Sequence, residues 1–166
     1  MISSNLWHTE KHSELLQEVG RVTIRWAEVD LLLVDLAFVI LRNLEAAHQH
    51  VFQMSAAGTE RLRRFDRIVG SSDLSTAERR AIMAVTERLR SLYSTRNDIV
   101  HSPIVLAYSV EGARINSRLT KISREGKQRD VSLSTIRKHA DDVGQCIGKL
   151  EELATELSAN HGKNTL

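Results

Sequence analysis

Pro103 is the only proline in this chain of 166 residues, and the pattern of apolar residues changes there. Before it, apolar side chains recur at helical spacing over long stretches. After it, residues 104–110 are β-branched and aromatic, as is typical of strands. Proline cannot continue a helix, because it lacks an amide hydrogen and its ring clashes with the preceding turn. The chain is therefore expected to be helical before Pro103 and to enter a β segment after it.

Periodic apolar residues predict three helical stretches before Pro103 and one at the end of the chain. They are expected over residues 9–43, 45–69, 76–101 and 134–158. A break of the second stretch at Gly58 is an alternative, because glycine often ends a helix. Ser75 and Glu78 have the spacing of a capping box, which predicts that the third helix starts at Thr76.

The first helix is expected to be the centre of a helical bundle. Most of residues 22–41 are apolar, and a polar stripe recurs every seven residues: Arg21, Glu28, Asp35 and Arg42. Asp30 falls outside that stripe, because two residues turn an α-helix by about 200°. The most apolar run, residues 29–41, is too short to span a bilayer and contains two aspartates. No membrane association is therefore expected.

Aromatic residues make up 4% of the chain, which favours helix-on-helix packing over a β-sandwich. Residues 104–133 are expected to form a small antiparallel hairpin or meander, with turns at Gly112 and Gly126. The predicted fold class is all-α, an antiparallel bundle of four to five helices with this β insertion before the last helix. One domain is expected over residues 1–160, with a flexible tail at 161–166.

The net charge of +2 permits a nucleic-acid partner without demanding one. The β insertion is basic, and Arg114, Arg118 and Lys121 could grip RNA phosphates. Such charge also protects the edge of a sheet, and this alternative stays open. Cys146 has no second cysteine to pair with, so it is interpreted as a buried structural thiol in a reduced, cytoplasmic setting.

A second basic cluster lies in the helical stretch before residue 69. It consists of four arginines: Arg61, Arg63, Arg64 and Arg67. Charge runs on a helix are usually a solvated face, and this cluster is interpreted in that way.

Arg96 interrupts an apolar stripe of the third helix. The stripe is made of residues at helical spacing: Ile82, Val85, Leu89, Leu92 and, after Arg96, Ile99. An unpaired charge in an apolar setting is costly, so Arg96 is expected to meet a carboxylate, a second subunit or a ligand. Asp30 is the candidate carboxylate.

Asn97 and His101 add the groups needed for proton transfer and phosphate binding. His101 can take or give a proton near neutral pH. Arg96 can bind a phosphate and stabilise the charge that develops on it, and Asn97 can orient His101 or bind a phosphate oxygen. In an unbroken helix Arg96 and His101 would be about 140° apart. We therefore expect their convergence to require a distorted last turn or a second subunit.

The sequence RNDIVH, residues 96–101, resembles the R-x4-6-H motif of the HEPN superfamily. A long apolar first helix with Trp26 and acidic residues, and a motif on the third helix, are also similar to that family. Arg42 and His48, with five residues between them, also fit the four-to-six spacing of this motif. That pair continues the solvated stripe of the first helix, so it is interpreted as coincidental.

The resemblance implies a dimeric, metal-independent endoribonuclease. The 2′-OH of RNA would be the nucleophile, and the products would be 2′,3′-cyclic phosphate and 5′-OH ends. Arg96, Asn97 and His101 would be catalytic, with Asp30 and Asp98 supporting them. Toxins and defence effectors occur in the family, so an antitoxin protein is an implied partner. No cofactor or metal is expected, because the chain lacks a glycine-rich phosphate loop and a cysteine-pair site.

The same residues also fit a protein without catalytic activity. An arginine on an apolar stripe can form a structural ion pair, and a histidine at a helix end can cap backbone carbonyls. The alternative function is a non-catalytic helical dimerisation module, or a module that binds nucleotides or RNA.

Overall fold

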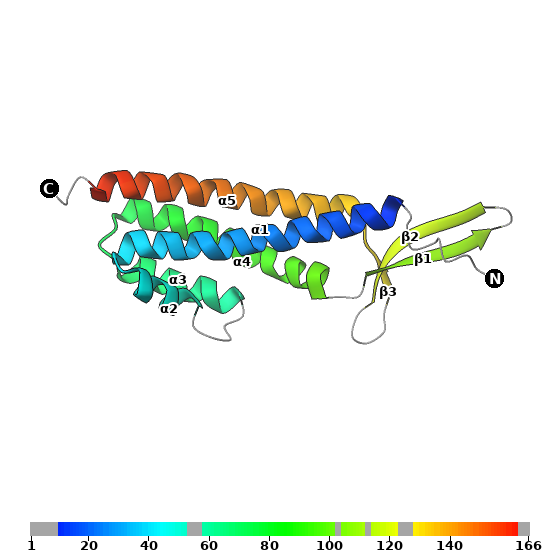
Figure 1. Cartoon of the computed structure of the whole chain (residues 1–166), viewed down its shortest axis with the longest axis horizontal. Coiled ribbons are helices and arrows are strands. Elements are labelled where there is room, and N and C mark those ends of the chain that lie inside the picture. Colours follow the sequence, from blue (N-terminus) through cyan, green and yellow to red (C-terminus); the bar gives the residue numbers. More distant parts are fainter. Residues whose placement is uncertain (1–9, 53–57, 102–103, 112–113, 123–127, 163–166) are drawn as a thin grey trace. The chain divides into compact units, whose positions relative to one another are not determined.

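Helices and strands follow one another in the order α1 (Glu10–Leu41), α2 (Leu44–Phe52), α3 (Gly58–Ser71), α4 (Thr76–His101), β1 (Ile104–Glu111), β2 (Arg114–Ile122), β3 (Gln128–Asp130) and α5 (Leu133–Gly162) (Figure 1). The computed structural model describes residues 10–52, 58–101, 104–111, 114–122 and 128–162. The predicted fold class, a helical bundle with a small β insertion before the last helix, is confirmed. Among the described helices, none is both long and apolar enough to cross a membrane.

The chain divides into two compact units. The sheet unit comprises residues 1–24 and 95–141, and the bundle unit comprises residues 25–94 and 142–166. The helices α1, α4 and α5 each contribute a segment to both units. The single domain expected over residues 1–160 stays a prediction. The last helix is longer than expected, because α5 extends to Gly162.

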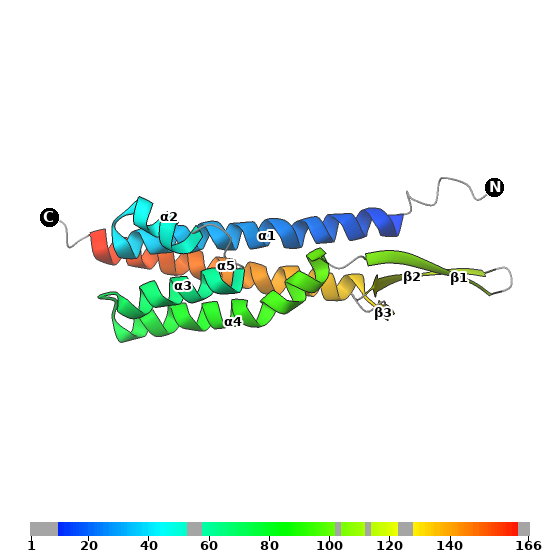
Figure 2. The same cartoon turned by 90° about the horizontal axis from the view of Figure 1, so that it is seen from below.

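The bundle unit has a dry aliphatic core. Within this unit α3 and α4 run antiparallel, joined by residues 72–75 (Figure 2). Side chains less than 2% exposed come from every helix segment of the unit: Val29, Leu33, Leu36, Val51, Leu62, Phe65, Ile82, Leu89, Leu150 and Leu157. Burial of such side chains is the main favourable term in folding.

The start of α4 is fixed by the predicted capping box. The Ser75 amide donates to Glu78 Oε2 at 2.8 Å, and the Glu78 amide donates to Ser75 Oγ at 3.2 Å. These two bonds satisfy amides that have no partner in the first turn of a helix. The expected start at Thr76 is thereby confirmed.

The first helix ends two residues earlier than expected, at Leu41. Arg42 adopts a left-handed backbone with φ 54°, and its amide donates to the Phe38 carbonyl at 2.8 Å. The side chain of Asn43 then caps α2, because its Oδ1 accepts from the Ala46 amide at 2.9 Å. Apolar periodicity continues past this turn, so it could not reveal that Asn43 starts a new helix.

Arg42→Gly should stabilise the protein by about 1 kcal/mol, because a left-handed backbone is strained for residues with a Cβ atom. The gain should appear as a melting temperature raised by about 2–4 °C. Arg42→Ala is the matched control, since it removes the same side chain and keeps the Cβ atom. An equal rise in both variants would mean that charge, and not backbone strain, is the cause.

The second helical stretch is divided into two helices, α2 and α3, which agrees with the alternative of a break at Gly58. α3 begins at Gly58, whose amide donates to Tyr93 Oη at 2.9 Å. A Cβ atom at position 58 would overlap the Tyr93 ring, so this close approach requires glycine. Tyr93 also meets the edge of Trp26, with ring centroids 5.3 Å apart. Residues 53–57 lie outside the described part of the chain.

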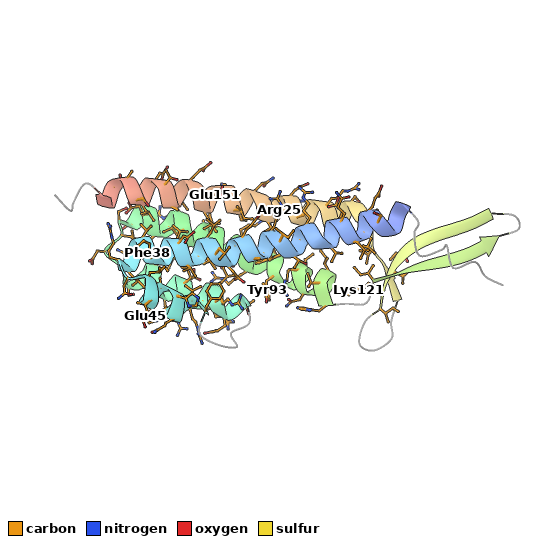
Figure 3. All side chains as sticks on the ribbon, viewed as in Figure 1. Arg25, Phe38, Glu45, Tyr93, Lys121 and Glu151 are labelled. Carbon is orange, nitrogen blue, oxygen red and sulfur yellow. The ribbon has the colours of Figure 1, made fainter. Side chains whose placement is uncertain are left out.

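The expectation that α1 is the enclosed centre of the bundle is wrong. In the bundle unit, Leu31 is 62% exposed and Phe38 is 44% exposed, although Leu33 and Leu36 on the same helix are fully buried. Figure 3 labels Phe38 near the C-terminal end of α1. A helix that is apolar nearly all round predicts burial on every side. Here one apolar face of α1 remains in contact with solvent.

The sheet unit contains the expected antiparallel meander, in the order β1-β2-β3. Ile104 pairs with Lys121 and Glu111 pairs with Arg114, so β1 and β2 are matched along their length. The third strand is shorter than expected and spans only Gln128–Asp130. The core of this unit comes from α1, the end of α4 and the start of α5: Leu15, Val22, Ile99, Ile136 and Ala140.

Ion pairs join α1 to α5 within the sheet unit. The Nε of Arg137 donates to Oε1 of Glu18 at 2.7 Å, and Arg21 Nη2 donates to Asp141 at 2.5 Å. The hydrogen bond to Glu18 is the main reason that the pKa of Arg137 is raised. The stripe that includes Arg21 is therefore not simply solvated. Arg137 of α5 pairs with both Glu14 and Glu18, which lie one turn apart on α1.

Candidate functional site

The three candidate catalytic residues lie on the last turns of α4, in the sheet unit. Ile99 beside them is buried, while Arg96 and Asn97 are half-buried and His101 is exposed. The helix ends at His101, as expected from Pro103 two residues later. The site thus combines an anchored apolar side with a polar side that faces solvent.

Arg96 brings the other two side chains together. Its Nη1 donates to Asn97 Oδ1 at 3.0 Å and lies 2.7 Å from His101 Nε2. A guanidinium has only donors and stays protonated in proteins. The imidazole nitrogen must therefore accept, so Nε2 carries a lone pair in this arrangement.

The expectation that convergence needs a distorted turn or a second subunit is wrong. α4 is α-helical through His101, and all three side chains belong to one chain. The long, flexible arginine side chain covers the angular separation that backbone geometry imposes. Spacing along a helix predicts where Cβ atoms point, but not how far a guanidinium reaches.

Asp98 and Lys121 connect α4 to the sheet. Figure 3 labels Lys121. Its Nζ lies 2.7 Å from Asp98 Oδ1, and the lysine side chain is only 19% exposed. The sequence predicts that Lys121 contacts RNA and that Asp98 supports the catalytic residues. The ion pair gives both a role in holding β2 beside α4.

Arg114 and Arg118 are placed by the strand register alone. Arg114 pairs with Glu111, and Arg118 pairs with Ala107. Their side chains lie outside the described part of the structure. A role for both in RNA binding stays a prediction.

Asp30, the expected partner of Arg96, lies in the bundle unit and accepts a hydrogen bond from Arg61. A pair between Asp30 and Arg96 stays a prediction. The Arg61 guanidinium also lies over the Phe52 ring, 5.1 Å from its centroid. The expectation of a wholly solvated arginine cluster is therefore wrong for Arg61, whose side chain is 29% exposed.

The bundle unit contains one further side chain that could be reactive, the thiol of Cys146. Cys146 is 4% exposed, and burial raises the pKa of its thiol, as expected for a structural cysteine. Within the residues described, no cluster of three histidine, cysteine or acidic side chains could hold a metal ion.

Comparison with known proteins found no match to a protein family model, to a curated protein or to a solved structure. The resemblance to the HEPN superfamily therefore depends on Arg96, Asn97, His101 and the helical layout.

Proposed function

We propose that the chain is a HEPN-like, metal-independent endoribonuclease. The observation that supports it is the contact of Arg96 with both Asn97 and His101 at the solvent-facing end of α4. These three residues supply a base, a cation and an orienting amide in one place. Cleavage of RNA through its own 2′-OH requires no more than these groups.

Proton transfer would begin at His101. Its Nε2 carries a lone pair that can take the proton of a ribose 2′-OH near neutral pH. The 2′ oxygen then attacks the adjacent phosphorus and the bond to the 5′ oxygen breaks. The 5′ oxygen takes a proton from water and becomes the 5′-OH end, and His101 releases the proton of the 2′-OH to water. The other end is a 2′,3′-cyclic phosphate.

Arg96 would change partners during the reaction. Without RNA its Nη1 occupies the Nε2 lone pair of His101, which blocks the base. A phosphate offers the guanidinium a stronger, charged acceptor than an imidazole does. Binding of RNA would thus draw Arg96 to the scissile phosphate and release His101 for proton abstraction. Asn97 would keep Arg96 near its working position.

The test is RNA cleavage in the presence of EDTA, comparing the wild type with His101→Ala. We expect the wild type to leave 2′,3′-cyclic phosphate ends. We expect His101→Ala to be slower by about 10²–10⁴-fold, the usual contribution of a general base. Circular dichroism should show equal helicity, since His101 is exposed. Equal cleavage by both proteins would remove His101 from the mechanism.

The exposed apolar face of α1 favours a second candidate function, a non-catalytic dimerisation module. Leu31 and Phe38 would be covered if two copies met through this face. A dimer also fits the ribonuclease, so association alone does not separate the two functions. Two results together would support the dimerisation module. The wild type would form dimers but cleave no RNA, and Leu31→Glu would be monomeric. A toxin or defence role, with an antitoxin as partner, belongs to the ribonuclease proposal.

A further inference from the structure

The arginines of α3 carry more charge than their carboxylate partners neutralise. Glu60 Oε1 lies 3.0 Å from Arg67 and 3.4 Å from Arg64. Its other oxygen lies 3.7 Å from Arg63. One carboxylate thus faces three guanidinium groups. The other acid of α3, Asp66, accepts hydrogen bonds from Arg90 and Thr86. Glu60 alone therefore neutralises only part of the positive charge of these three side chains.

A pocket of about 440 Å³ opens beside these arginines, within the bundle unit. It is lined by residues of α1, α2 and α3: Leu41, His50, Arg64, Arg67, Ile68 and Ser71. Its volume falls in the lower part of the range found for small-molecule sites, roughly 300–1,000 Å³. The lining thus combines three basic side chains with two aliphatic ones, so it offers both positive charge and an apolar surface to a ligand.

We propose that this pocket binds the phosphate group of a nucleotide or of a nucleic-acid end. A phosphate monoester carries up to two negative charges near neutral pH, and the two guanidinium groups that line the pocket together carry one more charge than Glu60, which pairs with both. Guanidinium groups bind phosphate oxygens through paired hydrogen bonds. The imidazole of His50 can donate one more. Leu41 and Ile68 provide an apolar surface for the attached sugar or base.

One opposing effect comes from the end of α3. The pocket lies near the last turn of this helix, where the helix dipole contributes about half a negative charge. Part of that effect is already reduced, because the Ser71 hydroxyl donates to the Arg67 carbonyl at 2.9 Å. Arg64 and Arg67 together carry one full charge more than Glu60, which outweighs a partial charge of this size, so the pocket retains its preference for an anion.

The phosphate pocket is separate from the proposed ribonuclease site. All six lining residues belong to the bundle unit, whereas Arg96, Asn97 and His101 belong to the sheet unit. The inference therefore does not depend on the proposed catalytic function. Phosphate binding should persist in His101→Ala.

Isothermal titration calorimetry with adenosine 5′-monophosphate, adenosine and inorganic phosphate tests this inference. We expect the monophosphate to bind and adenosine to bind at least about tenfold more weakly. Arg64→Gln combined with Arg67→Gln should weaken monophosphate binding at least about tenfold. Arg63→Gln is the matched control, because it removes a guanidinium that also faces Glu60 but does not line the pocket. It should change the affinity less than about threefold.

The single variant Arg67→Gln keeps the test valid if the double variant does not fold, because that side chain is 71% exposed. Inorganic phosphate that binds as tightly as the monophosphate would identify phosphate itself as the ligand. Competition by a 5′-phosphorylated oligonucleotide, but not by its unphosphorylated form, would identify a nucleic-acid end. Equal binding of monophosphate and adenosine would overturn the proposal. The proposal would also be overturned if both Arg67→Gln and the double variant bound the monophosphate with wild-type affinity. Loss of monophosphate binding in His101→Ala would overturn it too.

Discussion

Replacing Arg96 with alanine should lower the rate of RNA cleavage by about 10²–10³-fold, the usual cost of removing one group that stabilises charge in the transition state. Arg96 is the only one of the three proposed catalytic residues for which the described structure shows contacts with both others. Its loss would remove the guanidinium that is proposed to bind the scissile phosphate, and would also remove the group that contacts His101. Arg96→Lys should recover part of the rate, because it keeps the charge but not the planar fork.

Thermal melting separates a catalytic Arg96 from a structural one. If the residue is catalytic, Arg96→Ala should lose activity with a melting temperature within about 2–4 °C of the wild type, which corresponds to about 1 kcal/mol. Arg42→Ala is the matched control, because Arg42 also fits the motif spacing to a histidine, His48, but is exposed after α1. Unfolding of Arg96→Ala at a much lower temperature would assign Arg96 to the support of the fold.

Asp66→Ala should lower the free energy of unfolding by about 2–3 kcal/mol, because it removes two hydrogen bonds to a charged carboxylate that is largely shielded from water. Asp66 Oδ1 accepts from the hydroxyl of Thr86 at 2.7 Å, and Oδ2 accepts from Arg90. Thr86 is fully buried, and the Asp66 side chain is only 16% exposed. Denaturant unfolding measures the loss, which corresponds to a melting temperature lower by about 4–12 °C.

Glu87→Ala provides the control, because it removes the other carboxylate that binds the same arginine. Hydrogen bonding to Glu87 is the largest cause of the raised pKa of Arg90, followed by the opposing effect of burial and then by Asp66. Glu87 is nevertheless 72% exposed, so water screens the pair. Its loss should cost no more than about 0.5 kcal/mol. A cost equal to that of Asp66→Ala would show that burial does not decide which carboxylate stabilises the fold.

Signals within a few residues predicted the fold well. Ser75 and Glu78 located the start of α4, because a capping box is a local arrangement of four residues. Pro103 located its end, and the change of period after it located the meander. The end of α1 was missed because Arg42 adopts its left-handed backbone without being a glycine. Nothing in its residue type signals that conformation.

Pairing between distant charges could not be predicted in the same way. Arg137 pairs with Glu18 across 119 residues, and Arg61 pairs with Asp30 across 31. The chain has 23 basic and 21 acidic residues, so many pairings satisfy charge equally well. Only the rotation and register of packed helices decide between them. The pocket of Arg64 and Arg67 was missed for the same reason, since it requires His50 and Leu41 from two other helices.

The contact of Arg96 with His101 was predicted in part: the residues were identified, as for the local signals, but their geometry was not, as for the distant ion pairs. The sequence singled out side chains that do meet in the structure, because an arginine on an apolar stripe is conspicuous. It predicted the wrong geometry, since the directions of Cβ atoms do not account for the length of an arginine side chain. Candidate residues on one helix can therefore meet even when their backbone positions diverge.

Cys146 provides the bundle unit with a natural reporter of its own motion. The thiol is 4% exposed, and burial raises its pKa, so a thiol-modifying reagent meets little reactive thiolate in the closed protein. Modification must then wait until α5 separates locally from its neighbours. The rate of labelling, followed at increasing reagent concentration, measures how often that opening occurs. A single native cysteine thus allows the dynamics of the helical core to be timed without any engineered probe.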